Sequence, residues 1–306
     1  MINKQIILTG IIIILSSNVF AEKELPILKG PYLGQTPPGT TPELFAPGIV
    51  STESFEATIW FSEDALTSVF CRYSGDKSGI RMMKQKDGKW SKSELFPNIK
   101  SGLDGDFLFS PDGKKMVFSS QRPLSENEEK LDFCYIYLME KKQNGWSEPI
   151  KLEAPINSGM HDSYPCLTAD NDLYFFSRRD GGHGKSDIYR STYINGEYNT
   201  VDNLGSTINS KDQDFDAFVA PDESYIIFCS DRPGGYGYAD LYISFRKLDN
   251  TWTEPVNMGE EINSEGDEWT PFVTLDGKYL FFSTDKTRNR EVYWVDAGII
   301  EKLRKK

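Results

Sequence analysis

Short apolar runs recur along the chain, and residues that favour turns separate them. The runs lack the clean alternation of a strand with one solvated face, so they predict strands that are covered on both faces. Five segments align without gaps on an aspartate that begins a turn: Asp64, Asp112, Asp170, Asp222 and Asp276. An aromatic residue follows each aspartate by six positions, and successive aspartates are 48, 58, 52 and 54 residues apart. The chain therefore contains an internal repeat.

Each copy of the repeat predicts four strands. The first strand ends at the aspartate turn, the second carries the apolar run, and the third follows a loop that contains Gly or Pro in several copies. Four of the copies then close with a turn and an aromatic residue, at Trp90, Trp146, Tyr198 and Trp252. Four strands per repeat is the makeup of a propeller blade, so we expect an all-β protein with the β-propeller fold.

The two ends of the chain predict how the ring closes. The fifth copy lacks the closing turn and aromatic residue, whereas residues 22–48 precede the first copy and belong to none. A strand from residues 22–48 that completed the last blade would pair an open edge. We therefore predict five four-stranded blades in residues 49–306, closed by an N-terminal strand and followed by a short basic C-terminal tail. Six blades, with residues 22–48 contributing more than one strand, are the alternative.

Composition agrees with this fold and narrows the classes of partner. The 306 residues include 6 Trp, 15 Tyr and 19 Phe, with 25 Gly and 16 Pro, which favours pleated strands and turns. The formal net charge of −12 would repel a phosphate backbone. We therefore expect no binding of nucleic acid.

The repeat resembles the WD40-like repeats of the TolB-type propeller family. Three segments carry the likeness: FSPDGKKMVFSSQR (109–122), CSDRPGGYGYADLY (229–242) and TLDGKYLFFSTDK (274–286). The resemblance covers about residues 49–297 and implies a propeller, although in the first copy Ala65 replaces the Gly that follows the turn aspartate. Such propellers serve as docking platforms, as domains beside hydrolases and as stand-alone enzymes, so the resemblance implies no single activity.

Residues 1–21 predict a secretory signal peptide. Lys4 precedes an apolar run from Ile6 to Leu15, and the polar stretch that follows ends in Val19, Phe20 and Ala21, after which we expect cleavage. The apolar run is too short to cross a bilayer, which takes roughly 20 residues. We therefore expect a periplasmic or secreted protein without a membrane span after cleavage; a retained membrane anchor is the alternative.

The four cysteines raise the question of disulfides, because exported proteins often contain them. They are Cys71, Cys134, Cys166 and Cys229. Matching positions in different blades of a closed ring lie too far apart for a bridge. We therefore expect four buried free thiols.

A carboxylate lies eight residues before each turn aspartate, at Glu56, Asp104, Asp162, Asp214 and Glu268. The first strand of a propeller blade lines the channel, so the five acids would form a ring near one mouth. Oxygen ligands suit Ca²⁺ or Mg²⁺, which makes the ring a candidate metal site, with calcium as the candidate cofactor. We favour the alternative, in which each acid caps N–H groups of a nearby loop. Asp212, Asp214 and Asp216 would share one face of a strand.

A second repeated set joins basic residues after the second strand to acids before the third. It comprises Arg179 with Asp187, Arg232 with Asp240, and Lys286 with Glu291. We expect ion pairs that hold the loop within each blade; an arginine-bearing face for an acidic ligand is the alternative. Exposed loop aromatics would complete that face, so the candidate ligand-binding residues are Arg179, Arg232, Tyr236 and Tyr238.

Catalytic signals are few, so we expect that the protein is not an enzyme. The chain has 2 His, His161 and His183, which excludes the histidine-rich metal site that the resemblance implies for pectin-fragment lyases. It also lacks a G-x-S-x-G elbow. His161, beside Asp162, is the best catalytic candidate, although a structural role is the more common one for such a histidine.

We therefore expect an exported, non-enzymatic propeller, monomeric by default, that binds a protein or peptide or acts as a scaffold. The alternative is a carbohydrate-active or sugar-binding propeller that uses carboxylates at the channel mouth. Paired carboxylates can serve as acid and base, and aromatic rings can stack on sugars.

Overall fold

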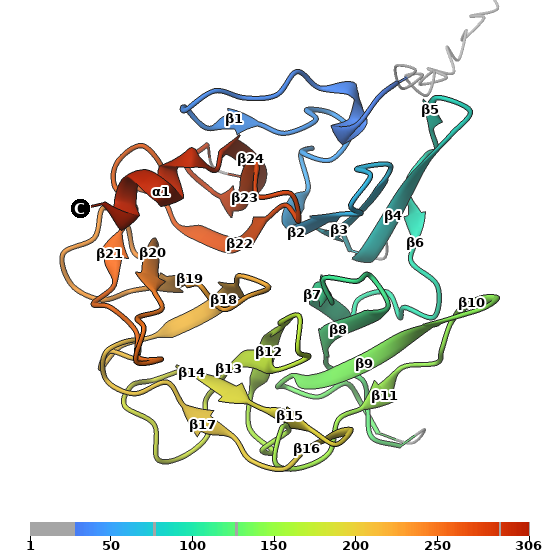
Figure 1. Cartoon of the computed structure of the whole chain (residues 1–306). Helices are drawn as coiled ribbons and strands as arrows, with labels where there is room; N and C mark the ends of the chain where they lie inside the picture. The colour runs from blue at the N-terminus through green and yellow to red at the C-terminus, as the bar shows by residue number, and fades with distance from the viewer. Residues whose placement is uncertain (1–27, 76–77, 126–127, 288, 306) are drawn as a thin grey trace, which may run out of the picture.

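The structure is a computed structural model that describes residues 28–75, 78–125, 128–287 and 289–305. Five antiparallel sheets surround a common axis (Figure 1). The predicted signal peptide, residues 1–21, and the part of the closing segment before residue 28 lie outside the described residues.

Each blade has three long strands and a short outer strand, in sequence order from the axis outwards except in the fifth. The first blade contains β2 (Phe55–Phe61), β3 (Thr67–Tyr73), β4 (Gly79–Lys86), β5 (Lys89–Trp90) and β6 (Glu94–Leu95). The second contains β7 (Asp104–Phe109), β8 (Lys115–Ser120), β9 (Tyr135–Lys142), β10 (Gly145–Trp146) and β11 (Ile150–Lys151). The third contains β12 (Asp162–Leu167), β13 (Leu173–Ser177), β14 (Asp187–Ser191) and β17 (Asp202–Asn203), with the hairpin β15 (Tyr193–Ile194) and β16 (Glu197–Tyr198).

The last two blades complete the ring. The fourth contains β18 (Asp214–Val219), β19 (Tyr225–Ser230), β20 (Asp240–Phe245) and β21 (Val256–Asn257). The fifth contains β22 (Glu268–Val273), β23 (Tyr279–Thr284), β24 (Glu291–Asp296) and, at its outer edge, β1 (Glu43–Leu44). Contacts link the first strands in the cycle β2, β7, β12, β18, β22 and back to β2. The prediction of five closed blades is therefore confirmed.

The N-terminal segment closes the ring as predicted. Glu43 pairs with Trp294 and Leu44 with Tyr293, so β1 covers the edge of β24. The next residue, Phe45, is fully buried, and its ring contacts Phe61, Phe281 and Trp294 at centroid distances of 5.6, 5.1 and 5.1 Å. Only β1 and the short helix η1 (Tyr32–Gly34) form among the described residues of this segment, so it adds one strand and no sixth blade.

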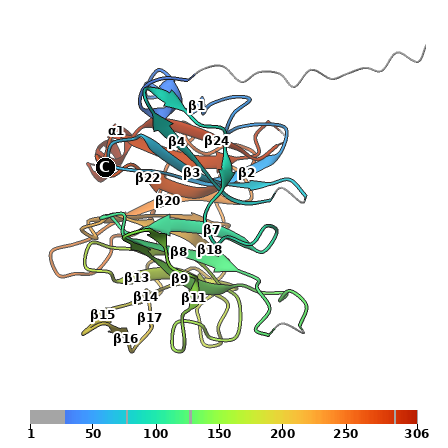
Figure 2. The ribbon, with the colours of Figure 1, turned by 90° about the vertical axis from the view of Figure 1, so that its right-hand side faces the viewer.

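The C-terminal tail ends in a helix, α1 (Gly298–Arg304), near β1 at the same edge of the disc (Figure 2). Ile299, Ile300 and Leu303 are buried, and the guanidinium of Arg304 lies 4.4 Å from the centroid of the Phe245 ring. The basic tail is therefore an amphipathic helix that packs onto the propeller.

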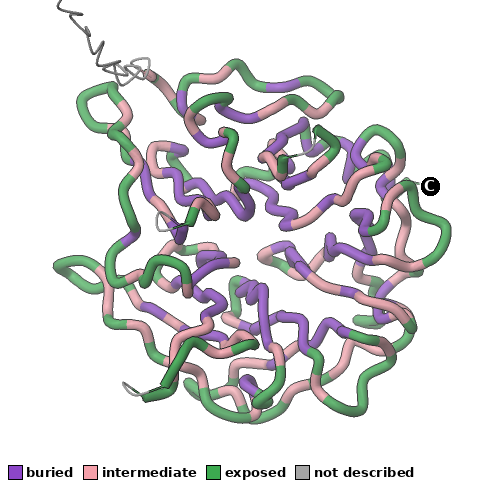
Figure 3. The backbone as a smooth tube through the Cα atoms, turned by 180° about the vertical axis from the view of Figure 1, so that it is seen from behind, coloured by how far each residue is buried: buried purple, intermediate pink, exposed green. Residues whose placement is uncertain are grey.

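The aspartate turns explain why the first two strands of a blade pair. Asp112 accepts hydrogen bonds from the Ser110 hydroxyl and the Lys114 backbone N–H, which stabilises the turn. Asp64 and Asp276 do the same in the first and fifth blades. The strands that follow are buried on both faces, and the buried backbone surrounds the axis (Figure 3).

Because neighbouring strands are antiparallel, the connections alternate between two faces. We call the side with the aspartate turns the turn face. We call the opposite side the loop face; it has the loops that lead into the first strands and those that join the second and third strands. The acid ring and the predicted ligand-binding residues lie towards the loop face.

Candidate site at the channel mouth

The five predicted ring acids lie at the starts of the first strands, and each is at most 2% exposed. Each accepts a hydrogen bond from the backbone N–H four residues earlier. Four of these bonds, from Thr52, Lys100, Ser158 and Ser264, have lengths of 3.0, 2.6, 2.7 and 3.1 Å. The chain thus tightens the loop that leads into each blade by folding it around the acid.

The remaining lone pairs of the acids are satisfied within the same blade. Asp214, for example, accepts hydrogen bonds from the Ser230 hydroxyl and the Arg232 guanidinium, both at 2.7 Å. Equivalent ion pairs join Arg72 to Glu56, Arg122 to Asp104 and Arg179 to Asp162, at 2.8, 2.6 and 2.9 Å. These contacts support the capping role. Calcium binding by the ring stays a prediction, and no three His, Cys, Asp or Glu side chains among the described residues are grouped to hold a metal ion.

The fifth blade has no arginine in this position. Lys286 replaces it, with its ammonium 3.9 Å from the centroid of the Tyr293 ring, and no ion pair to Glu268 forms. Burial raises the pKa of Glu268 to about 7, while hydrogen bonds from Ser264 and Thr284 oppose the rise. The ring therefore contains one acid that titrates near neutral pH.

The predicted ion pairs between the second and third strands are wrong. Asp240 accepts hydrogen bonds from the backbone N–H groups of Tyr236 and Gly237, at 2.7 and 2.9 Å, and from the Asn257 amide. Asp187 does the same in the third blade, and Glu291 accepts a bond from the Thr287 hydroxyl. Asp187 and Asp240 hold glycine-containing loops through the backbone, because Arg179 and Arg232 pair with the acid ring instead.

Two predicted ligand-binding residues point into their own blades. The Arg232 guanidinium lies over the rings of Phe228 and Tyr242, with centroid distances of 5.2 and 4.9 Å, and its partner Asp214 is fully buried. Arg179 is packed in the same way in the third blade. A role for either arginine in binding a ligand stays a prediction, since its guanidinium already has protein partners.

A β-bulge in each first strand turns one residue towards the axis. The bulges fall two residues after each ring acid, at Thr58, Asp106, Tyr164, Asp216 and Thr270. All but Thr58 have a positive φ. The expectation that Asp214 and Asp216 share a strand face is therefore wrong, because the bulge interrupts the two-residue alternation of the strand.

The channel is filled below its mouth. Tyr164 is 1% exposed, and its hydroxyl donates a hydrogen bond to the Pro271 carbonyl at 3.1 Å. This bond joins the third blade to the fifth. Thr270 links neighbouring blades in a similar way, since its hydroxyl accepts a bond from the Thr58 N–H. Hydrogen bonds from the bulge residues therefore link different blades at the centre of the ring.

Two acids, the buried Asp216 and the partly buried Asp106, remain at the channel with Arg290. Burial raises the pKa of Asp106 and raises that of Asp216 well above its usual value, and the charge of Arg290 opposes both shifts. The Tyr73 hydroxyl donates to Asp106 at 3.4 Å. Two nearby carboxyl groups in one buried site disfavour a second negative charge. Burial and the neighbouring carboxyl group therefore raise the pKa at this site, and Arg290 opposes the rise.

Arg290 is the unusual member of this group. Its guanidinium lies between two aromatic rings, 4.0 Å from the centroid of Phe55 and 3.4 Å from that of Trp269. Its Nε is buried without a hydrogen-bond partner, and no hydrogen bond or ion pair joins the guanidinium to another described residue. Arg290 is thus a positioned cation at the mouth of the channel. The charges of Asp106 and Asp216 act on it, but its guanidinium forms no hydrogen bond or ion pair with a described residue.

The catalytic candidates His161 and Asp162 are neighbours in sequence whose side chains have separate partners. Nδ1 of His161 accepts a hydrogen bond from the Cys134 N–H at 3.3 Å, and its ring lies 5.5 Å from that of Phe176. Burial and the charge of Arg178 lower the pKa of His161 to about 4. Asp162 belongs to the acid ring. His161 is therefore neutral at pH 7.

Large apolar and aromatic side chains are exposed on the loop face. Tyr236 and Tyr238 are 50% and 66% exposed in the loop between β19 and β20. Met160 and Phe55 are 45% and 39% exposed at the starts of two first strands. The predicted tyrosines are thus accessible, and sequence reasoning missed Phe55, Met160 and Arg290.

All four cysteines are free, as predicted. Cys71, Cys166 and Cys229 are buried, whereas Cys134 is only partly buried, which corrects the expectation of four buried thiols. Burial raises the pKa of Cys134 to about 12, so its thiolate is scarce at neutral pH.

Comparison with known proteins supports the fold but assigns no family. No protein-family model matches the sequence, and no curated protein matches it. Among solved structures, TolB from Acinetobacter baumannii is similar with a TM-score of 0.52 and 19% identity, over 80% of this chain and 55% of that one. The chain thus spans about half of that TolB.

A second solved structure agrees. The putative TolB from Agrobacterium tumefaciens has a TM-score of 0.53 and 16% identity, over 80% of this chain and 78% of that one. At these identities the likeness shows the propeller fold alone. No helix among the described residues is long and apolar enough to cross a membrane. The structural comparisons therefore show that the chain is a propeller with a fold similar to that of TolB.

Proposed function

We propose that the chain is an exported, periplasmic or secreted propeller that binds a protein or peptide over the mouth of its channel on the loop face. The similarity of its fold to TolB structures supports a binding or scaffolding module. The channel itself is filled by Tyr164, so the partner would lie across the mouth. The proposed role requires no chemistry from the acid ring.

Arg290 is the observation that carries this proposal. Four arginines beside the acid ring are paired with carboxylates, whereas the Arg290 guanidinium has neither a hydrogen bond nor an ion pair among the described residues. Rings on both sides hold its guanidinium in place, which lowers the entropy lost when a partner binds. An arginine fixed between aromatic residues is typical of the residues that dominate binding energy.

The surrounding surface extends the contact that a partner could make. Phe55, Met160, Tyr236 and Tyr238 are all exposed on this face. The net charge of −12 and the unpaired Arg290 together favour a partner that presents a carboxylate to the mouth within a largely uncharged or basic surface. We expect an acidic side chain or a C-terminal carboxylate at Arg290.

Affinity capture with quantitative mass spectrometry tests this function. The tagged chain would be incubated with extract of the source compartment, beside two loop-face variants, Tyr236→Ala/Tyr238→Ala and Arg290→Gln. We expect the same partner to be depleted in both variants, by about tenfold for Arg290→Gln because a charged hydrogen bond is lost.

Ile194→Ser/Leu248→Ser is the matched control. These residues are 56% and 108% exposed on the turn face, so the substitutions remove similar apolar surface from the opposite side. The control should retain the partner. Identical partners for all variants, or no specific partner for any, would contradict binding at the loop face.

A second candidate function is the binding or hydrolysis of a carbohydrate at the same mouth. It is favoured by Asp106 and Asp216, whose raised pKa values would supply a protonated carboxyl beside an ionised one. Glycoside hydrolases use such a pair as acid and base. Trp269 and Phe55 could stack on sugar rings.

Incubation with a panel of polysaccharides tests this candidate. Release of reducing ends by the wild type, lost in Asp106→Asn and Asp216→Asn, would support hydrolysis. Glycan-array binding that depends on Trp269 would support a sugar-binding role instead. The absence of both removes the carbohydrate candidate and leaves the protein or peptide partner.

A further inference from the structure

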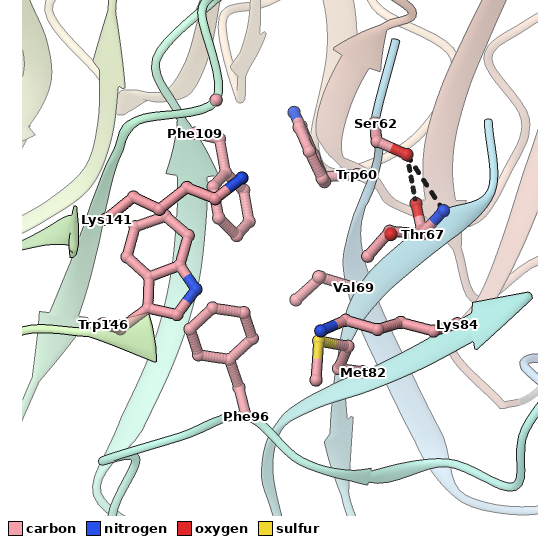
Figure 4. Close-up of a pocket in the computed structure, with 11 residues that line it drawn as sticks. Trp60, Ser62, Thr67, Val69, Met82, Lys84, Phe96, Phe109, Lys141 and Trp146 are labelled. Atoms are coloured by element: carbon pink, nitrogen blue, oxygen red, sulfur yellow. Dashed lines mark hydrogen bonds between the residues drawn. The ribbon is translucent and has the colours of Figure 1, made fainter. Parts of the chain in front are cut away.

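A pocket lies between the first and second blades on the turn face, away from the channel mouth (Figure 4). Its volume is about 200 Å³. Trp60 and Val69 line it from the first blade, Phe109 and Trp146 line it from the second, and Phe96 lies between the blades. The pocket is thus built by two blades and by the link that joins them.

Four aromatic side chains form part of the pocket wall. The rings of Trp60 and Phe109 are 4.1 Å apart, and Phe96 lies 5.4 Å from Trp146. An apolar cavity of about 150 Å³ is enough to bind benzene. The pocket that these rings border therefore has room for one six-membered ring.

Two ammonium groups point into this pocket from opposite sides. Lys84 reaches it from β4 and Lys141 from β9 (Figure 4). Both lysines are exposed, and neither side chain makes a hydrogen bond or ion pair with another described residue, so both ammonium groups are available to a ligand. In a chain with a net charge of −12, two unpaired ammonium groups beside one pocket indicate an anionic ligand.

The pocket also contains an unpaired buried donor. Trp60 is 6% exposed, and its Nε1 has no hydrogen-bond partner. A buried indole N–H usually has an acceptor, and leaving it without one costs free energy. A ligand that reached this N–H with an oxygen atom would satisfy it.

The residues that line the pocket favour an aromatic ligand over a sugar. Ser62 and Thr67 are the only lining residues with hydroxyl groups, and the Ser62 hydroxyl already donates to Asp64 at 2.6 Å. The hydroxyl groups of a sugar would therefore be buried largely without partners, which is unfavourable. An aromatic ring needs no such partners.

We propose that this pocket binds an aromatic carboxylate, with the ring against Trp60, Phe96 and Trp146 and the carboxylate between Lys84 and Lys141. The ligand is either a free aromatic acid or the C-terminal aromatic residue of a polypeptide, since both present a ring and a carboxylate together. This site lies on the opposite face from the channel mouth and is independent of the function proposed there.

Calorimetric titration of the full chain tests the ligand chemistry. The probes are phenylacetate and its neutral analogue phenylacetamide, together with acetyl-Gly-Gly-Phe as the free acid and as the amide. We expect each acid to bind at least about tenfold more tightly than its amide, because the amide lacks the charge that both lysines require. Tighter binding of the peptide acid than of phenylacetate identifies a polypeptide C-terminus as the source, and the reverse order identifies a free acid.

Matched lysine variants test the location. Lys84→Gln/Lys141→Gln should weaken binding of the acids roughly tenfold or more and leave the weak binding of the amides unchanged. Lys86→Gln/Lys142→Gln removes the same charge from the same two strands at residues that do not line the pocket, so it should bind as the wild type does. Equal affinity for acids and amides, equal loss in both double variants, or no saturable binding of any probe would overturn the proposal.

Discussion

Glu268 and Asp214 occupy equivalent positions in neighbouring blades, yet their carboxylates have different partners. Arg232 pairs with Asp214, whereas Lys286, in the corresponding position, does not reach Glu268. The hydroxyl groups of Ser264 and Thr284 bind Glu268 but bring no positive charge. The pKa of about 7 at Glu268 therefore follows from one arginine-to-lysine difference between blades.

Lys286→Arg should remove this difference. The pKa of Glu268 rises from 4.5 to about 7 on folding, so the native state binds more protons between these values and becomes less stable as the pH rises through 7. An arginine would pair with Glu268 and lower that pKa. Urea unfolding should show that the variant's gain in the free energy of unfolding is about 1 to 2 kcal/mol larger at pH 8.5 than at pH 5.5.

Lys278→Arg is the control for this change, because Lys278 is exposed and pairs with the turn aspartate Asp276. It should alter stability little at either pH. A gain from Lys286→Arg that does not depend on pH would show that Glu268 is not the titrating group.

At the scale of elements, the loops between second and third strands depend on their acids. Asp240 accepts hydrogen bonds from two backbone N–H groups, and a Cβ atom added at Gly235 would collide with its carboxylate. The sequence contains both features, but it does not show that the acid binds the backbone. Arg232 was predicted to pair with Asp240 because the two residues flank one loop, whereas the fold brings it to Asp214.

Asp240→Asn should destabilise the fourth blade. The introduced NH₂ group cannot accept the hydrogen bonds that the carboxylate receives, so at least one buried N–H loses its partner, at a cost of about 2 to 3 kcal/mol. Thermal unfolding measures the loss. Glu254→Gln, at an exposed acid in the same blade, should leave the midpoint unchanged; an equal loss in both variants would contradict the role of Asp240.

The short apolar runs predicted the strands but missed the bulges. The apolar runs and aspartate turns gave the first three strands of each blade, because these strands are long and buried. The bulge residue Asp216 was interpreted as an ordinary strand position, since a two-residue period cannot show where a strand gains a residue. A signal was present, because each bulge lies two residues after a ring acid.

Arg290 could not have been found from the sequence. It lies in the fifth blade, outside every repeated motif, and its importance comes from rings on two different strands, β2 and β22. The pocket between the first and second blades could not be predicted either, because its lining residues come from different blades. The repeat predicts what is common to the blades, whereas the candidate binding residues are those at which the blades differ.

At the scale of the whole molecule, the ring depends on its N-terminal segment. Phe45→Ala should destabilise the protein by about 3 to 5 kcal/mol, because a fully buried aromatic side chain is removed from the junction of the first and fifth blades. Urea unfolding followed by tryptophan fluorescence measures this loss. Phe45→Leu should cost less, and a loss below about 1 kcal/mol for Phe45→Ala would contradict closure by this segment.

Site-specific photo-crosslinking tests the proposed binding face most directly. A photoreactive residue would replace Tyr238 on the loop face or, in a second protein, Leu248 on the turn face, and both would be illuminated in extract of the source compartment. The account predicts a discrete adduct from position 238 that disappears in the Arg290→Gln background and is absent from position 248. The same adducts from both positions, or an adduct at position 238 that persists without Arg290, would contradict it.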